Sequence, residues 1–345
     1  MDAIIVPTTR PVAYLENVVA LARHHQCTLV ALCSRYSSPD AAAILAERAG
    51  VKVVAIDFNE VPIDFLPPLR TTAMLRGGRF DRRNDISPKR NLGLLLAAVA
   101  GWDRVVFMDD DITIPAPADL GEAAGLLDRF AGVGLSIGGY PDNSVVCHAY
   151  REAGGAQDTF IGGGALAVGR ESFTSFFPDI YNEDWFFLVG ETGLVPCAVT
   201  GLAVQAPYDP YRDTMRARAE ELGDSLAEGL FGLLDAGRGL AEATEDYWLW
   251  FLSRRRRFID DVIVMVDDTR LDGPTKQRMI AALKAASARN RLIEPRLCVE
   301  YLAAWREDRA DWHDHVEAIQ HRYGGWPVSK LLADFGLLHR YRGRT

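Results

Sequence analysis

Short apolar runs alternate with amphipathic stretches over the first third of the chain. The runs at residues 3–7, 27–34 and 51–57 are rich in β-branched residues and predict buried strands. Between them, residues 12–24 and 40–49 carry apolar positions at helical spacing. This β-α-β-α-β order predicts a parallel sheet with helices on both faces, whose ligands gather at the carboxyl ends of the strands.

A further helix and strand follow a Gly/Arg-rich loop. In the stretch SPKRNLGLLLAAVAG, Ser87 is the expected N-cap, Pro88 the first helical residue and Gly101 the C-terminal stop. The helix leads into DRVVFMDDD, a predicted buried strand that ends in three consecutive aspartates, Asp109 to Asp111.

The pattern changes twice in the rest of the chain. Residues 132–207 contain shorter, glycine-punctuated apolar runs, which predict strands and hairpins. After about residue 211 the pattern is mostly helical, with helices expected over 215–234 and 242–258.

Charge places a domain boundary at this second change. The 345 residues carry a formal net charge of -9. Residues 1–210 hold 16 Lys and Arg against 25 Asp and Glu, whereas residues 211–345 hold 22 against 22. With Pro207 and Pro210 interrupting the pattern, we expect an α/β domain over 1–210 and a mainly helical extension over 211–345. The acidic balance of the first part disfavours nucleic-acid binding.

One basic cluster interrupts the acidic part. Between residues 70 and 90 only Asp81 and Asp85 are acidic, which suggests a site for a small anionic ligand. The basic residues of this cluster are Arg70, Arg76, Arg79, Arg82, Arg83, Lys89 and Arg90.

Other features predict a cytoplasmic protein without a transmembrane segment. Five scattered cysteines form no CxxC pair and indicate neither a disulfide framework nor a zinc site. No apolar run approaches the roughly 18 residues of a membrane span, and the first residues include an acid instead of a basic cluster.

The three aspartates are the strongest chemical signal. In an extended strand, Asp109 and Asp111 point one way and Asp110 the other. Two carboxylates about 6 Å apart repel by roughly 3 kcal/mol at an effective dielectric of about 20. A divalent cation such as Mg²⁺ or Mn²⁺ removes that repulsion, because hard cations prefer oxygen ligands. The alternative is a solvated strand end with one aspartate capping a turn.

Four motifs together resemble the GT-A nucleotide-sugar glycosyltransferases, particularly family 2. They are IIVPTTRP, RNLGLLLAAVAGWDRVVFMDDDI with its D-x-D motif, FIGGGALAVG and NEDWFFL, and the resemblance covers about residues 3–208. It implies a GT-A, Rossmann-like mixed sheet flanked by helices, with the C-terminal helical extension added to it.

The resemblance implies a metal-dependent transfer of a sugar from a nucleotide-diphosphate donor to a hydroxyl acceptor, with inversion. Asp109 and Asp111 would hold Mn²⁺ or Mg²⁺ on the diphosphate. Asp184 would be the general base that takes the acceptor proton, with Glu183 beside it on the sugar or acceptor. Such a base contributes roughly 10² to 10⁴ in rate. The identity of the nucleotide base, the sugar and the acceptor stays open, and so does a retaining outcome in place of inversion.

The remaining donor contacts follow from the same resemblance. Lys89 and Arg90 would approach the diphosphate or ribose from a helix N-terminus, and Asp110 would lie nearer the ribose or sugar. Asp57, after the third strand, could hydrogen-bond the base. The nucleotide pocket would be lined by Pro7, Thr8, Thr9 and Arg10. Backbone close to the sugar would come from Gly162, Gly163 and Gly164.

A histidine metal ligand that many relatives supply has no counterpart after the acidic pair. The chain reads LAVQAPYDPYRD there, so Gln205, Tyr208 or Asp209 is a candidate third ligand. His313 or His315 of DWHDH could reach back from the helical extension.

Each site residue also has a structural interpretation. Glu183 and Asp184 could cap a helix, the glycines could form a tight hairpin, and Lys89 and Arg90 could be solvated helix surface.

In the extension, DYWLWFLSRRRRF could lie on a membrane surface. We expect instead that Trp248, Leu249 and Leu252 pack while Arg254 to Arg257 stay solvated. Packing against the catalytic domain, closing the acceptor site and forming a homodimer stay open as roles of the extension.

Three other functional classes stay open. DDDIT and VMVDDTRLD (264–272) match the acidic motifs of haloacid-dehalogenase-type phosphatases, but no lysine for phosphate occurs between Lys89 and Lys276. A sugar-1-phosphate nucleotidyltransferase would carry a G-x-G-T-R loop, which PTTRP does not provide. The third class is a non-catalytic nucleotide-sugar-binding or scaffold protein.

Overall fold

The computed structural model describes residues 1–61, 65–82, 84–139, 144–156, 161–190, 192–335 and 341–344. Two positions of the motifs above, Arg83 of the basic cluster and Phe160 before the glycine run, lie outside the described residues.

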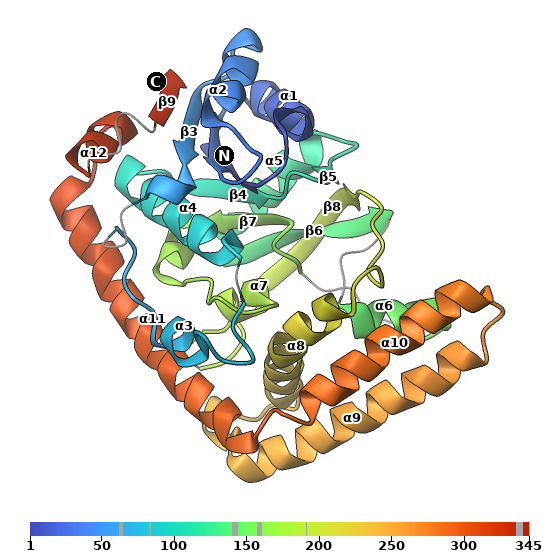
Figure 1. The fold of residues 1–345 in the computed structure, drawn as a ribbon. Coiled ribbons are helices and arrows are strands. Elements are labelled where there is room, and N and C mark those ends of the chain that lie inside the picture. Colours follow the sequence, from blue (N-terminus) through green and yellow to red (C-terminus); the bar gives the residue numbers. More distant parts are fainter. Residues whose placement is uncertain are drawn as a thin grey trace.

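The described residues form one mixed sheet of nine strands in the order β5-β8-β6-β7-β4-β1-β2-β3-β9. Its centre is parallel, since β1 pairs with both β2 and β4, and β2 pairs with β3. On the other side β7 runs antiparallel to both β4 and β6 (Figure 1). The strands are β1 (Ala3–Thr8), β2 (Thr28–Cys33), β3 (Val53–Asp57), β4 (Arg104–Met108), β5 (Ile112–Thr113), β6 (Gly132–Gly139), β7 (Ala165–Gly169), β8 (Cys197–Gln205) and β9 (Tyr341–Arg344).

Helices flank this sheet and dominate the chain after β8, so the predicted α/β class with a mixed sheet and C-terminal helices is confirmed. The α-helices are α1 (Glu16–His25), α2 (Pro39–Arg48), α3 (Arg70–Leu75), α4 (Ile86–Ala100), α5 (Ala118–Gly125), α6 (Val145–Glu152), α7 (Glu183–Phe187), α8 (Thr214–Asp235), α9 (Glu245–Asp267), α10 (Gly273–Asn290), α11 (Pro295–Tyr323) and α12 (Val328–Asp334). None of those in the described ranges is both long and apolar enough to cross a membrane.

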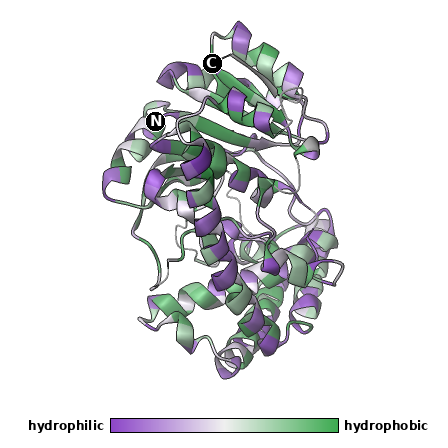
Figure 2. Ribbon diagram, turned by 90° about the vertical axis from the view of Figure 1, so that its left-hand side faces the viewer, coloured by the Kyte–Doolittle hydropathy of each residue, from purple (hydrophilic) through white to green (hydrophobic). Residues whose placement is uncertain are grey.

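Alternate residues of the central strands enter two separate cores. Ile5 and Phe107 face one side of the sheet, where they pack with α4, α7, α8 and α11. Ile4 and Val106 face the other side, against α1, α2 and α5. Because successive strand side chains point to opposite faces, strands that are apolar at every position must be covered on both sides. Figure 2 shows this as apolar strands between helices of mixed polarity.

The start of α4 differs from the prediction. The helix begins at Ile86 with Asp85 as the N-cap residue, so Ser87 lies inside the first turn. The Ser87 hydroxyl donates to the carbonyl oxygen of Pro178 at 2.8 Å. The hydroxyl therefore binds a residue that is distant in the sequence, and a local capping pattern does not reveal such a partner.

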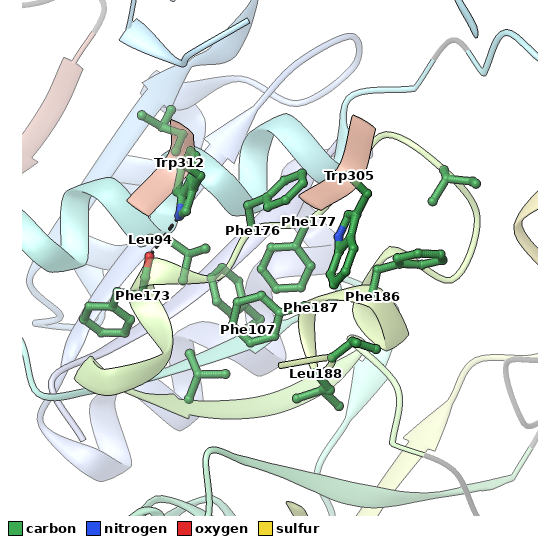
Figure 3. Packing of buried hydrophobic residues seen from close by; sticks show 14 of the residues in the cluster. Leu94, Phe107, Phe173, Phe176, Phe177, Phe186, Phe187, Leu188, Trp305 and Trp312 are labelled. Carbon is green, nitrogen blue, oxygen red and sulfur yellow. Dashed lines mark hydrogen bonds between the residues drawn. The ribbon is translucent and has the colours of Figure 1, made fainter. Parts of the chain in front are cut away.

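The C-terminal helices return to the sheet. Trp305 and Trp312 of α11 are buried against phenylalanines of the first core (Figure 3). The indole N–H of Trp312 donates to the carbonyl oxygen of Phe173 at 3.0 Å. Beyond α12, β9 pairs antiparallel with β3 at the edge of the sheet. The extension therefore shares the first core with the sheet.

The aromatic and basic segment of α9 only partly follows the prediction. Trp248 and Leu252 are buried as expected, but Leu249 is 59% exposed. Arg255, expected to be solvated with its neighbours, is 2% exposed. Four successive residues on a helix point in different directions, so one of the four arginines faces inward and needs buried acidic partners.

Candidate functional site

The chain's crossover between β3 and β4 creates the site. β1 lies between β2 and β4, so the chain builds outward to β3 and then returns to the other side of β1. The residues after β1 and after β4 consequently meet at the carboxyl edge of the sheet, where open α/β folds bind ligands. Thr8 Oγ1 donates to Asp110 Oδ2 at 2.7 Å, which joins the two loops.

The three aspartates lie in a turn instead of in the strand. β4 ends at Met108, and the carbonyl oxygen of Asp109 accepts the N–H of Ile112 at 3.2 Å. The expected alternation of an extended strand is therefore wrong. Asp110 and Asp111 both bind the guanidinium of Arg10, which donates to Asp111 at 2.8 Å. The turn brings these two carboxylates together because it reverses the chain.

Arg90 links Asp109 to the predicted base region. Its guanidinium donates to Asp109 at 3.0 Å and to Glu183 at 2.8 Å. Burial alone would lower the pKa of Arg90, but Asp109, Glu183 and Asp184 raise it above its ordinary value. Arg90 is therefore a permanent buried cation and not the solvated helix surface of the alternative interpretation.

Lys89 is also buried. Its ammonium donates to the carbonyl oxygen of Thr8 at 2.8 Å and to Ser34 Oγ at 2.7 Å, and pairs with Asp85 at 3.1 Å. Burial lowers the pKa of Lys89, against the opposing effect of Asp85. Lys89 thus connects the ends of β1 and β2 to the first turn of α4.

All three aspartates line a cavity of about 400 Å³, which we call the aspartate cavity. Its basic groups are Arg10, Arg35, Lys89 and Arg216, and they balance Asp85 and the three aspartates in formal charge. The full lining is Pro7, Thr9, Arg10, Arg35, Asn84, Asp85, Ile86, Lys89, Asp109, Asp110, Asp111, Gln205, Tyr208 and Arg216. A mixed set of cations and carboxylates suits a ligand that carries both phosphate and hydroxyl groups.

A second cavity of about 100 Å³ adjoins the first and is called here the glycine cavity. The two share Ile86, Asp109 and Gln205. Gly162, Gly163 and Gly164 form one wall and Glu183 and Asp184 another. Asp109 thus lies on the boundary between the proposed donor side and the acidic pair.

The acidic pair has two different environments. Glu183 is buried and accepts from Arg90 at 2.8 Å and Arg82 at 3.3 Å. Asp184 accepts the N–H of Gly163 at 2.5 Å and that of Trp185 at 2.9 Å. Burial and the neighbouring Glu183 raise the pKa of Asp184 to about 6, although Arg90 and the two N–H groups act in the opposite direction. Two adjacent carboxyl groups with such different surroundings are typical of divided catalytic roles.

The glycine run leaves space for a side chain of the protein itself. A side chain at Gly163 would place its Cβ 2.5 Å from Nη1 of Arg90. At Gly164 the nearest atom would be Asp109 Oδ2, at 3.4 Å. The close neighbour at Gly163 is thus Arg90, where we expected a sugar.

Arg216 and Arg35 are cavity residues that the sequence did not single out. Arg216, at the start of α8, stacks over the ring of Tyr208, with 4.5 Å between Cζ and the ring centroid, and pairs with Glu220 at 2.5 Å. Three residues of the basic cluster, Arg82, Lys89 and Arg90, line one of the two cavities. Arg70 of the same cluster pairs with Glu307 of α11 instead. Arg216 belongs to a helix whose surface charges show no special pattern, so only the tertiary structure reveals it.

The candidate third ligands separate into two groups. Gln205 and Tyr208 line the aspartate cavity, whereas Asp209 caps the N–H of Tyr211 at 2.9 Å. His315 contacts the carbonyl oxygen of Phe65 at 3.1 Å. His313 lines a different cavity with Ala98 and Gly101 at the end of α4, about 20 Å from the helix start. The suggestion that these histidines reach the aspartates is therefore wrong.

Asp57 ends β3 as expected but has a local partner. Its carboxylate accepts the backbone N–H of Asn59 at 3.1 Å and the Asn59 amide at 3.0 Å. A contact from Asp57 to a nucleotide base stays a prediction.

Within the described part of the chain, no group of three or more His, Cys, Asp or Glu side chains is arranged to hold a metal ion. The Arg10 guanidinium already lies against Asp110 and Asp111. Any divalent cation here would therefore need ligands from a bound molecule as well.

Comparison with known proteins gives limited similarity. No family model matches the chain, and no curated protein sequence matches it. Among solved structures, it is similar to the mannosyltransferase PcManGT from Pyrobaculum calidifontis, in complex with GDP-Man and Mn²⁺, with a TM-score of 0.43 and 16% identity. The similarity covers 89% of this chain and 86% of that one.

Proposed function

We propose that this protein is a glycosyltransferase that moves a sugar from a nucleotide-diphosphate donor to a hydroxyl acceptor. The observation that carries the proposal is the pair of adjoining cavities with Asp109 on their boundary. One cavity offers charged groups for a diphosphate, and the other offers a carboxyl group with a raised pKa for proton transfer. A sugar bound across the boundary would have its reacting carbon between them.

On the donor side, cations stabilise the leaving group. Breaking a glycosyl–phosphate bond leaves an additional negative charge on the diphosphate, and prearranged positive groups lower the cost of forming it. Arg35, Lys89 and Arg216 line the aspartate cavity, and we assign this task to them. The three N–H groups of Lys89 already have partners in Thr8, Ser34 and Asp85, so Lys89 would act on the diphosphate through its charge.

We propose Mn²⁺ or Mg²⁺ as the cofactor of the aspartate cavity. Such ions are bound in phosphate-transferring sites by one or two carboxylates together with substrate phosphates, so a cluster of three protein ligands is not required. Asp109 and Asp111 would hold it, and the position of Arg10 shows that the turn attracts positive charge. When bound, the ion would neutralise the leaving diphosphate.

On the acceptor side, Asp184 is the proposed general base. Glu183 is bound by Arg82 and Arg90, so we assign it the role of holding these two guanidinium groups. Asp184 has the raised pKa and lines the glycine cavity, where an acceptor hydroxyl can give up its proton. One displacement by that hydroxyl inverts the configuration of the sugar carbon, and we propose this outcome.

The second acidic motif of the phosphatase alternative lies outside both cavities. Asp267 and Asp268 of VMVDDTRLD lie exposed at the C-terminal end of α9. They line neither cavity, so the two acidic motifs do not meet in the aspartate cavity or in the glycine cavity. The aspartate turn alone does not support that function.

Donor turnover tests the proposal. We would incubate a panel of nucleotide sugars with the protein and Mn²⁺, then with the protein and a chelator, and measure released nucleoside diphosphate. Release from one donor that depends on Mn²⁺, and that Asp184→Asn slows, supports the proposal. Binding of a nucleotide sugar without release, even with a panel of hydroxyl acceptors, would favour a non-catalytic binding protein.

A further inference from the structure

The helix that carries Asp184 is too short to position it unaided. α7 has five residues, and its N-cap Asn182 has φ 60° and ψ 37°, in the left-handed region. Asparagine tolerates this conformation better than most residues, but it persists only where neighbouring structure holds it. Glu183 and Asp184 follow directly, so whatever fixes Asn182 also fixes the acidic pair.

The support for Asn182 comes from the helical extension. Its side-chain amide donates to Asp224 Oδ1 of α8 at 2.9 Å. The other oxygen, Asp224 Oδ2, accepts from Nη2 of Arg255 of α9 at 2.9 Å. Asp224 and Arg255 are both 2% exposed. The buried Arg255 of the four-arginine run is thus two hydrogen bonds from the N-cap of α7.

Arg255 is itself fixed on several sides. Its Nε and Nη2 donate to the two carboxylate oxygens of Glu221, at 2.7 and 3.0 Å, and its Nη1 donates to Glu228 at 2.5 Å. The side-chain amide of Asn290, at the end of α10, also donates to Glu221 at 2.9 Å. These contacts join α8, α9 and α10 around Arg255.

A close backbone approach gives a second, independent link between α8 and the same loop. A Cβ at Gly223 would lie 2.2 Å from the carbonyl oxygen of Tyr181, so α8 approaches the loop as only glycine allows. The rings of Trp185 and Phe231 also pack together, with centroids 4.5 Å apart. α7 and the loop before it therefore contact α8 at three points. Figure 1 shows α7 and α8 as neighbours.

We propose that Asp224, held by Arg255, is a positioning residue that orients Asp184 through Asn182. The inference rests on the proposed function, because it assigns the helical extension a part in the transfer step. Asp184 itself accepts the N–H of Gly163. In this proposal both the extension and the glycine run support the base.

Two variants break the link without removing the base. In Asp224→Asn the side chain has one accepting oxygen where the carboxylate has two, so either the contact to Asn182 or that to Arg255 is lost. In Asn182→Gly the left-handed conformation is kept, because glycine adopts it freely, but the amide is removed. Asp268→Asn, an exposed residue at the far end of α9, is the matched control.

Hydrogen exchange provides a readout that does not depend on activity. We expect faster amide exchange over residues 183–188 in Asp224→Asn and Asn182→Gly, with no change in Asp268→Asn. Circular dichroism and thermal unfolding show whether each variant is folded, and Asn182→Gly leaves the contacts of Arg255 in place should Asp224→Asn fail to fold. Unchanged exchange over residues 183–188 in a folded variant overturns the proposal.

Turnover measurements separate this proposal from the proposed function. We expect kcat for the donor to fall at least about tenfold in both variants, with the dissociation constant of the nucleoside diphosphate within about twofold of wild type. If Asp184→Asn abolishes turnover and the two variants keep a normal kcat, the positioning role is wrong and the function stands. If Asp184→Asn turns over normally, Asp184 is not the base, and the positioning role falls with it.

Discussion

The backbone N–H of Gly163 donates to the carboxylate of Asp184 over 2.5 Å. The same glycine leaves the space that the guanidinium of Arg90 occupies. One residue of the glycine run therefore supports both the proposed base and the buried cation beside it. Contacts within the protein thus explain the glycine at position 163, with no ligand required.

Gly163→Ala tests this explanation. The added Cβ would lie 2.5 Å from Nη1 and 2.8 Å from Cζ of Arg90, and Arg90 cannot withdraw without breaking its pairs with Asp109 and Glu183. We expect a loss of roughly 1–3 kcal/mol in the free energy of unfolding, measured by urea denaturation. Gly232→Ala, an exposed helical position with no atom within 4 Å of the added Cβ, should be neutral or stabilising. Equal behaviour of the two variants would contradict the account.

Asp184 should set the pH dependence of turnover. Its pKa is raised to about 6, and the base acts only when deprotonated, so kcat should rise with pH through about 6 and then level off. Asp184→Asn should lower kcat by roughly 10² to 10⁴ and remove that rise. Asp179→Asn is the matched control, since the pKa of Asp179 is also raised to about 6 by burial but the residue lines neither cavity. A rise that persists in Asp184→Asn would assign it to another group.

The central strands and their polar ends could be predicted from the sequence. A fully apolar strand such as residues 3–7 is stable only inside a sheet that is covered on both faces. The aspartates directly follow such a strand, so the sequence predicts them at the edge of the sheet. The partners of the aspartates could not be predicted. Arg10 and Arg90 meet them because a turn begins at Asp109, and turn geometry depends on long-range contacts such as that between Thr8 and Asp110.

The contribution of the extension was also beyond sequence analysis. Arg216 and Arg255 lie on helices with many other charges, and local periodicity does not show which charged residue faces inward. Their partners, Glu220 and Glu221, are on α8 within the same charged pattern. Pairing across helices, which decides these positions, requires the tertiary structure.

Arg10 should compete with a divalent cation. Its guanidinium binds Asp110 and Asp111, so a metal ion approaching the turn meets a positive charge. We expect Arg10→Gln to raise the affinity for Mn²⁺ in the absence of nucleotide by roughly tenfold, because one repulsive charge is removed. Electron paramagnetic resonance of free Mn²⁺ measures this directly, with exposed Arg23→Gln as the control. An unchanged affinity would contradict this competition between Arg10 and the metal ion.

Arg216 should contribute to diphosphate binding. It lines the aspartate cavity beside Tyr208, and a charge-assisted hydrogen bond to phosphate is worth about 1.5–3 kcal/mol. Arg216→Gln should therefore weaken nucleoside diphosphate binding roughly tenfold to a hundredfold in calorimetry, while Arg218→Gln, exposed on the same helix, should not. The remaining Glu220 can take up a proton, since burial raises its pKa to about 7. Equal affinities in the two variants would remove Arg216 from the site.

Thermal unfolding with nucleoside diphosphates and Mn²⁺ tests the central claim most directly. A ligand present at 100 times its dissociation constant stabilises the native state by about 2.7 kcal/mol. We predict that at least one nucleoside diphosphate raises the melting temperature when Mn²⁺ is present, and that Asp111→Ala abolishes the rise. If no nucleoside diphosphate stabilises the protein with or without Mn²⁺, the aspartate cavity is not a donor site and the account is contradicted.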